Sequence, residues 1–229
     1  MATFNGEKYI LDQLLSIIKQ LEPLDEIIIS DDSSTDGTID IIKSIGDSRI
    51  KLIEDQKFHS AIFNFENALK HASNDLIFLS DQDDLWVENK VKVMKEALAN
   101  YDMVVCDCSI IDENNNVLEK SYFNLVNSAP GIIRNLRKNT YFGCCMAFKI
   151  EVLRKALPFP KDIPMHDIWL GFISDIYFSA VFLAEPLTFY RKHSSNASIA
   201  SAVVSNLSLI TKLKFRINIL KYFPTLLFR

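Results

Sequence analysis

The chain has 229 residues, of which 48 % are hydrophobic and 24 % are charged, a composition typical of one globular domain that can bury a core. Its net charge of −4 argues against a nucleic-acid-binding protein. We find no signal peptide and no apolar run near the roughly 20 residues that span a bilayer. We therefore expect a cytoplasmic protein.

The first half of the chain alternates helix-like and strand-like segments. Apolar residues at helical spacing predict helices at residues 7–21, 39–45, 61–72 and 87–98. Continuous apolar runs predict strands at residues 26–32, 49–54 and 76–79. This alternation predicts an α/β fold with a Rossmann-like, mostly parallel central sheet flanked by helices.

Acidic residues follow two of the predicted strands: Asp31 and Asp32 after the first, and Asp81, Asp83 and Asp84 after the third. Like-charged carboxylates packed together cost free energy unless a cation or hydrogen-bond donors compensate them. Ligands of open α/β sheets bind at the carboxyl ends of the strands, so we expect both clusters to face one cleft. Oxygen ligands at this spacing suit Mg²⁺ or Mn²⁺ shared with substrate phosphates.

The acidic clusters also have a simpler interpretation, because Asp is a preferred helix N-cap. The second cluster could cap the helix after Trp86. Asp31 and Asp32 could cap the helix predicted at residues 39–45. The chain has no glycine-rich dinucleotide motif and no P-loop motif. The sequence therefore favours a nucleotide site built from carboxylates and a metal.

The opening residues 1–6 have the pattern of a turn that follows a strand, with no strand before it. A sheet without a central strand would leave unpaired backbone and an open apolar groove. We expect either a further apolar strand upstream in the intact protein or another segment in that position.

The second half is less regular. Strands are predicted at residues 103–112 and 141–149, and one or two more at 181–191, while residues 117–140 are expected to form loops. A helix is predicted to begin near Asp167, which could be its N-cap. The four cysteines lack zinc-finger spacing and are expected to be buried free thiols; they are Cys106, Cys108, Cys144 and Cys145.

The C-terminal part is basic and apolar. No acidic residue follows Glu185, and the basic residues after it are Arg191, Lys192, Lys212, Lys214, Arg216, Lys221 and Arg229. The spacing in residues 207–229 does not give a clean amphipathic helix. The charge favours an anionic partner, either a membrane surface or a phosphate.

Five segments in order resemble the family 2 glycosyltransferases, which have the GT-A fold, and most of all bacterial rhamnosyl- or galactosyltransferase-like members. The segments are residues 2–6, 30–38, 80–86, 166–169 and 190–193. The resemblance implies a GT-A domain over residues 1–196, with a nucleotide-binding half over about 1–112 and an acceptor half over about 113–196. Residues 197–229 would form a C-terminal extension, and its basic charge and aromatic content are the reason to hypothesise attachment to a membrane surface.

The resemblance assigns the nucleotide-sugar-binding residues of the first half. Thr3 and Phe4 would frame the base of the nucleotide. Asp31, together with Asp32, would accept hydrogen bonds from that base.

The resemblance also assigns the metal and the catalytic base. Asp81 and Asp83 match the family's DxD pair, with Asp83 the better ligand of Mn²⁺ or Mg²⁺ and Asp81 nearer the ribose. Asp167 matches the base that activates the acceptor, in a His-Asp pair where the family often has Glu-Asp. His193 lies in the segment that folds back towards the diphosphate.

These roles imply a metal-dependent, inverting glycosyltransferase. The metal would neutralise the leaving diphosphate, and a carboxylate base would take the proton of the acceptor hydroxyl. We expect transfer from a nucleotide-diphosphate sugar to a glycan or lipid-linked acceptor in cell-surface polysaccharide synthesis, at the inner face of the plasma membrane. Two alternatives remain: a nucleotidyltransferase, although no glycine-rich basic loop is visible near the N-terminus, and a nucleotide-sugar-binding subunit without catalysis.

Overall fold

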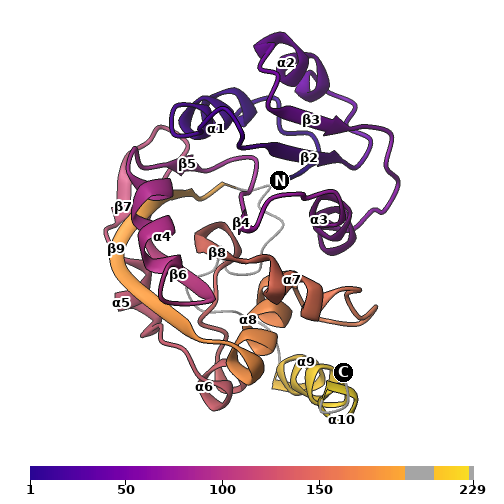
Figure 1. The fold of residues 1–229 in the computed structure, drawn as a ribbon, viewed down its shortest axis with the longest axis vertical. Coiled ribbons are helices and arrows are strands. Elements are labelled where there is room, and N and C mark those ends of the chain that lie inside the picture. The colour runs from indigo at the N-terminus through magenta and orange to yellow at the C-terminus, as the bar shows by residue number, and fades with distance from the viewer. Residues whose placement is uncertain (194–208, 227–229) are drawn as a thin grey trace.

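The structure is a computed structural model and describes residues 1–193 and 209–226 (Figure 1). Its strands are β1 (Ala2–Thr3), β2 (Ile27–Asp31), β3 (Ile50–Ile53), β4 (Leu76–Phe78), β5 (Leu85–Trp86), β6 (Met103–Ile111), β7 (Val117–Glu119), β8 (Met146–Lys149) and β9 (Ala180–Arg191). Its helices are α1 (Ile10–Ile18), α2 (Thr38–Ile45), α3 (Ala61–Lys70), α4 (Lys90–Leu98), α5 (Tyr122–Val126), α6 (Ile132–Arg137), the 3₁₀ turn η1 (Gly143–Cys145), α7 (Ile150–Ala156), α8 (His166–Tyr177), α9 (Leu209–Leu220) and α10 (Phe223–Leu226).

A small parallel sheet carries the N-terminal part of the chain. Its strands lie in the order β1-β2-β3, with Ala2 opposite Ser30 and Ile27 opposite Ile50. Every residue of β2 is buried, as its continuous apolar run predicts. Helices α1 and α2 lie on one side of this sheet and α3 on the other (Figure 1).

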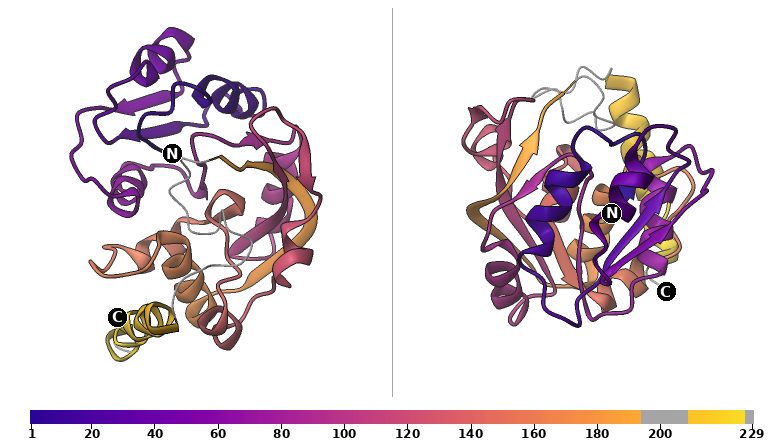
Figure 2. Two further views of the ribbon diagram at one scale, coloured as in Figure 1. Left: turned by 180° about the vertical axis from the view of Figure 1, so that it is seen from behind. Right: turned by 90° about the horizontal axis from the view of Figure 1, so that it is seen from above.

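A larger, curved sheet is built from the strands that follow residue 75 (Figure 2). Its strands lie in the order β4-β8-β6-β9-β5, and β7 pairs with β6. Strands β6 and β9 run parallel, whereas the β4–β8, β6–β8 and β5–β9 pairs are antiparallel. The α/β fold is confirmed, with one parallel and one mixed sheet. Strand direction could not be inferred from apolar runs, because a strand buried on both faces has the same pattern in either direction.

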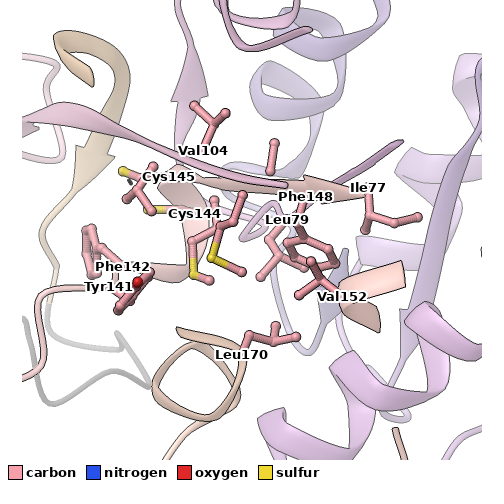
Figure 3. Close-up of a cluster of buried hydrophobic side chains, with 14 of the residues drawn as sticks. Ile77, Leu79, Val104, Tyr141, Phe142, Cys144, Cys145, Phe148, Val152 and Leu170 are labelled. Atoms are coloured by element: carbon pink, nitrogen blue, oxygen red, sulfur yellow. Dashed lines mark hydrogen bonds between the residues drawn. The ribbon is translucent and has the colours of Figure 1, made fainter. Parts of the chain in front are cut away.

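The main hydrophobic core joins the larger sheet to the helices beneath it. In Figure 3, Ile77 and Leu79 lie on one side of this core, and Phe142, Cys144 and Cys145 lie on the other. All four cysteines are buried free thiols, which confirms the sequence prediction.

Strand β1 covers only the end of β2. The amino group of Met1 donates to the carbonyl oxygen of Ile28 at 2.8 Å, and burial lowers the pKa of this amino group to about 5. Beside it lies a groove of about 240 Å³ that is lined by both sheets, including Ile28 of β2 and Ile77 of β4, and by Phe65 and Trp86. The groove expected from the sequence is therefore present, whereas Ala2 and Thr3, which were expected to belong to a turn, form strand β1.

Helix α9 is anchored to the rest of the molecule through one of its faces. Ile219 is buried, and Tyr222, just beyond the helix, packs edge-on against Trp169 with ring centroids 5.8 Å apart. No helix in the described part of the chain is both long enough and apolar enough to cross a bilayer. The predicted boundary between residues 196 and 197 lies outside the described residues.

Candidate active site

One cavity of about 440 Å³ lies between the end of the small parallel sheet and the helix α8. It is lined by six of the residues predicted from the sequence, namely Thr3, Phe4, Asp32, Asp81, Asp83 and Asp167. Asp31 does not line it, and His193 approaches it through a bond to Asp83. Acids separated by half the chain therefore share one cavity, as the argument from the strand ends predicts.

Asp31 bonds to its own turn and to the neighbouring strand β1. Its carboxylate accepts hydrogen bonds from the Thr3 hydroxyl at 2.8 Å and from the hydroxyl and backbone N–H of Ser34 at 2.6 and 2.8 Å. The residue is 1 % exposed. Asp31 thus positions Thr3, and direct contact with a nucleotide base remains a prediction.

Asp32 faces the cavity and orders its rim. Its two oxygens accept from the backbone N–H groups of Phe58 at 2.6 Å and Ser60 at 3.1 Å, in the loop that leads to α3. The capping interpretation is wrong for both Asp31 and Asp32, because α2 begins after Gly37. Its first N–H, that of Thr38, donates to Asp36 instead, at 3.0 Å.

Gln82, the middle residue of the DxD segment, joins the acidic loop to the end of β1. The Phe4 N–H donates to Gln82 Oε1 at 2.9 Å, and Gln82 Nε2 donates to the Phe4 carbonyl at 3.1 Å. A Cβ on Gly6 would lie 2.5 Å from Gln82 Oε1, so a side chain at this position would displace the Gln82 amide from this contact. Sequence reasoning missed this contact, because nothing local pairs residues 78 positions apart.

The acidic loop concentrates negative charge at the cavity. Loss of water raises the pKa of Asp81 to about 7, helped by the charges of Asp83 and Asp167. Burial also raises the pKa of Asp84, which is fully buried and accepts the N–H of Arg191 at 2.9 Å. The loop does not cap a helix, since α4 begins after Asn89, so the capping interpretation is wrong here too.

The residues present fit a divalent cation. Ligand atoms of Asp81, Asp84 and Cys144 lie within 4.8 Å of one another. Of these three residues only Asp81 lines the cavity, and burial raises the pKa of the Cys144 thiol, which disfavours the thiolate. Hard cations prefer oxygen ligands, and burial together with the charges of Asp83 and Asp167 raises the pKa of Asp81, so a bound cation would stabilise its ionised form. Asp81 with Asp83, both at the cavity, remains our predicted ligand pair.

The end of β9 braces the acidic loop from behind. Arg191 is 2 % exposed; its Nε donates to the Asp83 carbonyl at 2.9 Å and its Nη1 donates to Asn115 Oδ1 at 2.7 Å. His193 Nε2 lies 2.8 Å from Asp83 Oδ2. Both residues lie in the segment 190–193 that resembles the family, but only His193 was assigned a role there; the buried guanidinium of Arg191 positions the loop.

Asp167 lies in the first turn of α8. Its Oδ1 accepts the N–H of Ile168 at 2.7 Å, and the Gly143 N–H and the Asn139 side chain also donate to its carboxylate. Burial outweighs these bonds and raises the pKa of Asp167 to about 6. The N-cap of α8 is Met165, so the capping interpretation of Asp167 is wrong.

Comparison with known proteins shows the family of the chain. The profile described as "Glycosyl transferase family 2" matches residues 1–157. The chain is 30 % identical over 216 residues to the dTDP-rhamnosyl transferase RfbG of Shigella flexneri, covering 86 % of this chain and 72 % of that protein. It is 29 % identical over 204 residues to the β-1,3-glucosyltransferase WfgD of Escherichia coli, which acts from UDP-Glc on α-D-GlcNAc-diphosphoundecaprenol, covering 86 % of this chain and 78 % of that protein.

Solved structures share the fold. The Staphylococcus aureus TarS fragment 1–349 in complex with UDP-GlcNAc has a TM-score of 0.69 at 19 % identity, covering 97 % of this chain and 71 % of that one. The mannosyltransferase PcManGT of Pyrobaculum calidifontis, in complex with GDP-Man and Mn²⁺, has a TM-score of 0.64 at 19 % identity. The match covers 96 % of this chain and 67 % of that one. The chain belongs to glycosyl transferase family 2, and it is a glycosyltransferase with a GT-A fold. The nucleotidyltransferase and silent-subunit alternatives are therefore not retained.

Proposed function

We propose that the protein is a metal-dependent, inverting glycosyltransferase that moves a sugar from a nucleotide-diphosphate donor to an acceptor hydroxyl. The observation that carries the proposal is the common cavity, which Asp81 and Asp83 line together with Asp167. A transferase of this kind needs charge stabilisation for its leaving group and a base for its acceptor, held in fixed geometry.

The donor side of the cavity would hold the nucleotide. Thr3, Phe4 and Asp32 line the part next to the small sheet, where the ends of its parallel strands meet. Asp81 and Asp83 would hold Mn²⁺ or Mg²⁺ beside the diphosphate. The bound cation would neutralise the charge that develops on the departing diphosphate.

Asp167 would act as the base. Its raised pKa makes it a stronger proton acceptor than an ordinary carboxylate, while it stays ionised at neutral pH. The bonds from Gly143, Asn139 and Ile168 fix the orientation of the carboxylate. Direct attack of the acceptor oxygen on the anomeric carbon, on the face opposite the diphosphate, would invert the configuration. Asp167 would take the proton, and no covalent sugar intermediate would form.

The acceptor and location are proposed from the relatives and from the surface of α9. Several relatives are named as transferases to diphosphoundecaprenol-linked sugars, which supports a glycan or lipid-linked acceptor in cell-surface polysaccharide synthesis. Helix α9 and the start of α10 carry exposed apolar side chains at helical spacing, namely Leu213, Ile217, Leu220 and Phe223. Lys214 is exposed close by, whereas Lys221 forms an ion pair with Asp162. The apolar face and Lys214 together suit an anionic membrane surface.

Replacement of the base tests the proposal. With UDP-glucose or dTDP-rhamnose as donor, Mn²⁺, and an analogue of GlcNAc-diphosphate-lipid as acceptor, Asp167→Asn should lower transfer by about 10²- to 10⁴-fold. Nucleotide binding should be retained, because the carboxamide preserves the shape of the site. Asp12→Asn, on the exposed face of α1, is the matched control. Near-normal transfer by Asp167→Asn would show that the base is assigned wrongly.

A further inference from the structure

Next to Asp167 lies a buried histidine that the mechanism above does not use. His166 is the first residue of α8, lines the cavity and is 5 % exposed. Neither of its ring nitrogens has a hydrogen-bond partner among the residues that the structure describes. A buried polar atom left without a partner costs about 1–3 kcal/mol, so two on one ring are unusual.

The ring of His166 is held by packing alone. It stacks on Phe65 of α3, with ring centroids 4.0 Å apart and planes 28° apart. Its edge approaches η1, where a Cβ added to Gly143 would lie 3.1 Å from Nε2. Glycine at this position leaves the edge of the imidazole uncovered by a side chain.

A second buried polar atom without a partner faces the same cavity. Asn64 of α3 is 2 % exposed, and its Nδ2 donates to the Thr3 carbonyl at 3.1 Å. This bond fixes the amide, and within the described chain Asn64 Oδ1 has no hydrogen-bond partner. Asn64 and His166 flank Phe65 and both line the cavity that holds Asp83 and Asp167.

The chemistry of the pair selects a hydroxyl group. Burial, with a smaller contribution from the charged amino terminus, lowers the pKa of His166 to about 3, so the ring is neutral at physiological pH. A neutral imidazole offers one donor and one acceptor, and Asn64 Oδ1 offers an acceptor. A phosphate would need a cation or additional donors, whereas a hydroxyl both donates and accepts.

We propose that the imidazole of His166 and the amide oxygen of Asn64 bind hydroxyl groups of the sugar that is being transferred. The inference rests on the proposed function, because it takes the donor sugar to occupy this cavity. The bond from Asn64 to Thr3 places the pair on the donor side, and His166 adjoins the proposed base. The pair would thus contribute to the choice of donor sugar.

The variant His166→Phe separates this role from a structural one. It keeps an aromatic ring against Phe65 and removes both nitrogens. The probes are UDP, dTDP, UDP-glucose and dTDP-rhamnose, each with Mn²⁺ and the full chain. The quantity of interest is the gain in affinity of a nucleotide sugar over its bare nucleotide, measured by calorimetry.

The variant should bind the bare nucleotide as tightly as wild type does. Its gain in affinity for the nucleotide sugar over the bare nucleotide should be about tenfold smaller than that of wild type, as expected for one to two neutral hydrogen bonds. Its melting temperature without ligand should be unchanged or higher, because unpaired nitrogens leave the core. Asn64→Leu should also lose part of the gain. His71→Phe, on the exposed end of α3, is the control.

Two results would overturn the inference: a full gain in His166→Phe, or no gain in wild type although the Mn²⁺-nucleotide binds. A lower melting temperature with an unchanged gain would indicate packing alone. Failure of wild type to bind any Mn²⁺-nucleotide, or to transfer, would instead count against the proposed function.

Discussion

At the scale of single residues, Asp167 combines opposing influences on one carboxylate. Burial raises its pKa, and donors from Ile168, Gly143 and Asn139 oppose the rise, leaving it at about 6. Across the cavity, the neighbouring charge is that of Asp81. A base must be deprotonated to work, so activity should be present above this pKa and lost as the pH falls through it.

The raised pKa of Asp167 predicts how activity depends on pH. At saturating Mn²⁺, which keeps the DxD acids ionised, kcat/KM should fall about tenfold per unit of pH below about 6. Circular dichroism at each pH verifies that the protein stays folded. An acid limb near pH 4, the region of an unperturbed carboxyl, would contradict the role of burial at Asp167.

His193, just after β9, contacts the carboxylate of Asp83. Replacement by Ala removes the bond between His193 Nε2 and Asp83 Oδ2. Loss of a group that orients a metal ligand commonly lowers metal affinity by about 10- to 100-fold. Calorimetric titration of Mn²⁺ with UDP should show this loss in His193→Ala and not in His71→Ala. Equal affinities in all three proteins would mean that His193 does not position the metal ligand.

Some site residues were predictable and others were not. Asp81, Asp83 and Asp167 stand in short motifs, so one sequence suffices to indicate them. Gln82 and Arg191 act on backbone groups far along the chain, namely those of Phe4 and Asp83. Such roles depend on the fold, and the composition around these residues gives no hint of them.

At the scale of elements, strands β2, β3, β4, β6 and β9 and helices α1 to α4 were predicted within a few residues, because apolar periodicity marks them. Residues 141–149, predicted as one strand, form η1 and the shorter strand β8, and α7 and α9 were not predicted. Residues 117–140, expected to be loops, contain β7, α5 and α6. Helices this short depend on tertiary contacts. Asp107 of β6, for example, accepts the Phe123 N–H at 2.9 Å at the start of α5.

The junction of α4 with the larger sheet rests on a buried lysine. Lys90 Nζ donates to the Cys144 carbonyl and to Thr188 Oγ1, both at 2.7 Å, and lies 4.4 Å from the centroid of the Trp86 ring. Lys90→Met should lower the free energy of unfolding by about 1–3 kcal/mol, because the carbonyl loses its donor.

Urea unfolding measures this effect, with Lys92→Met on the exposed face of α4 as the control. If Lys90→Met were as stable as the control, the buried ammonium would not hold this junction together.

At the scale of the whole molecule, the cavity lies between the end of the small parallel sheet and α8. Helix α9 docks at the end of the molecule away from the small sheet (Figure 1). The spacing of residues 207–229 hid this helix, because both its buried and its exposed face are apolar. Ile219 faces the core, whereas Leu213 and Ile217 are 58 % and 54 % exposed.

The exposed face predicts membrane attachment. Flotation with anionic vesicles should fall about tenfold or more in Leu213→Gln/Ile217→Gln, since each buried apolar side chain contributes about 1.5–3 kcal/mol. The control Leu24→Gln/Ile133→Gln changes two exposed apolar residues elsewhere. Equal flotation of both double variants would refute attachment through α9.

The central claim is that one cavity holds the metal-nucleotide through Asp81 and Asp83 and the acceptor base through Asp167. Calorimetry of Mn²⁺ with UDP and with dTDP, beside transfer assays, tests it most directly in wild type, Asp83→Asn and Asp167→Asn. We predict that Asp83→Asn loses metal-dependent nucleotide binding, whereas Asp167→Asn keeps that binding and loses transfer. Undiminished binding by Asp83→Asn, or unimpaired transfer by Asp167→Asn, would contradict the account.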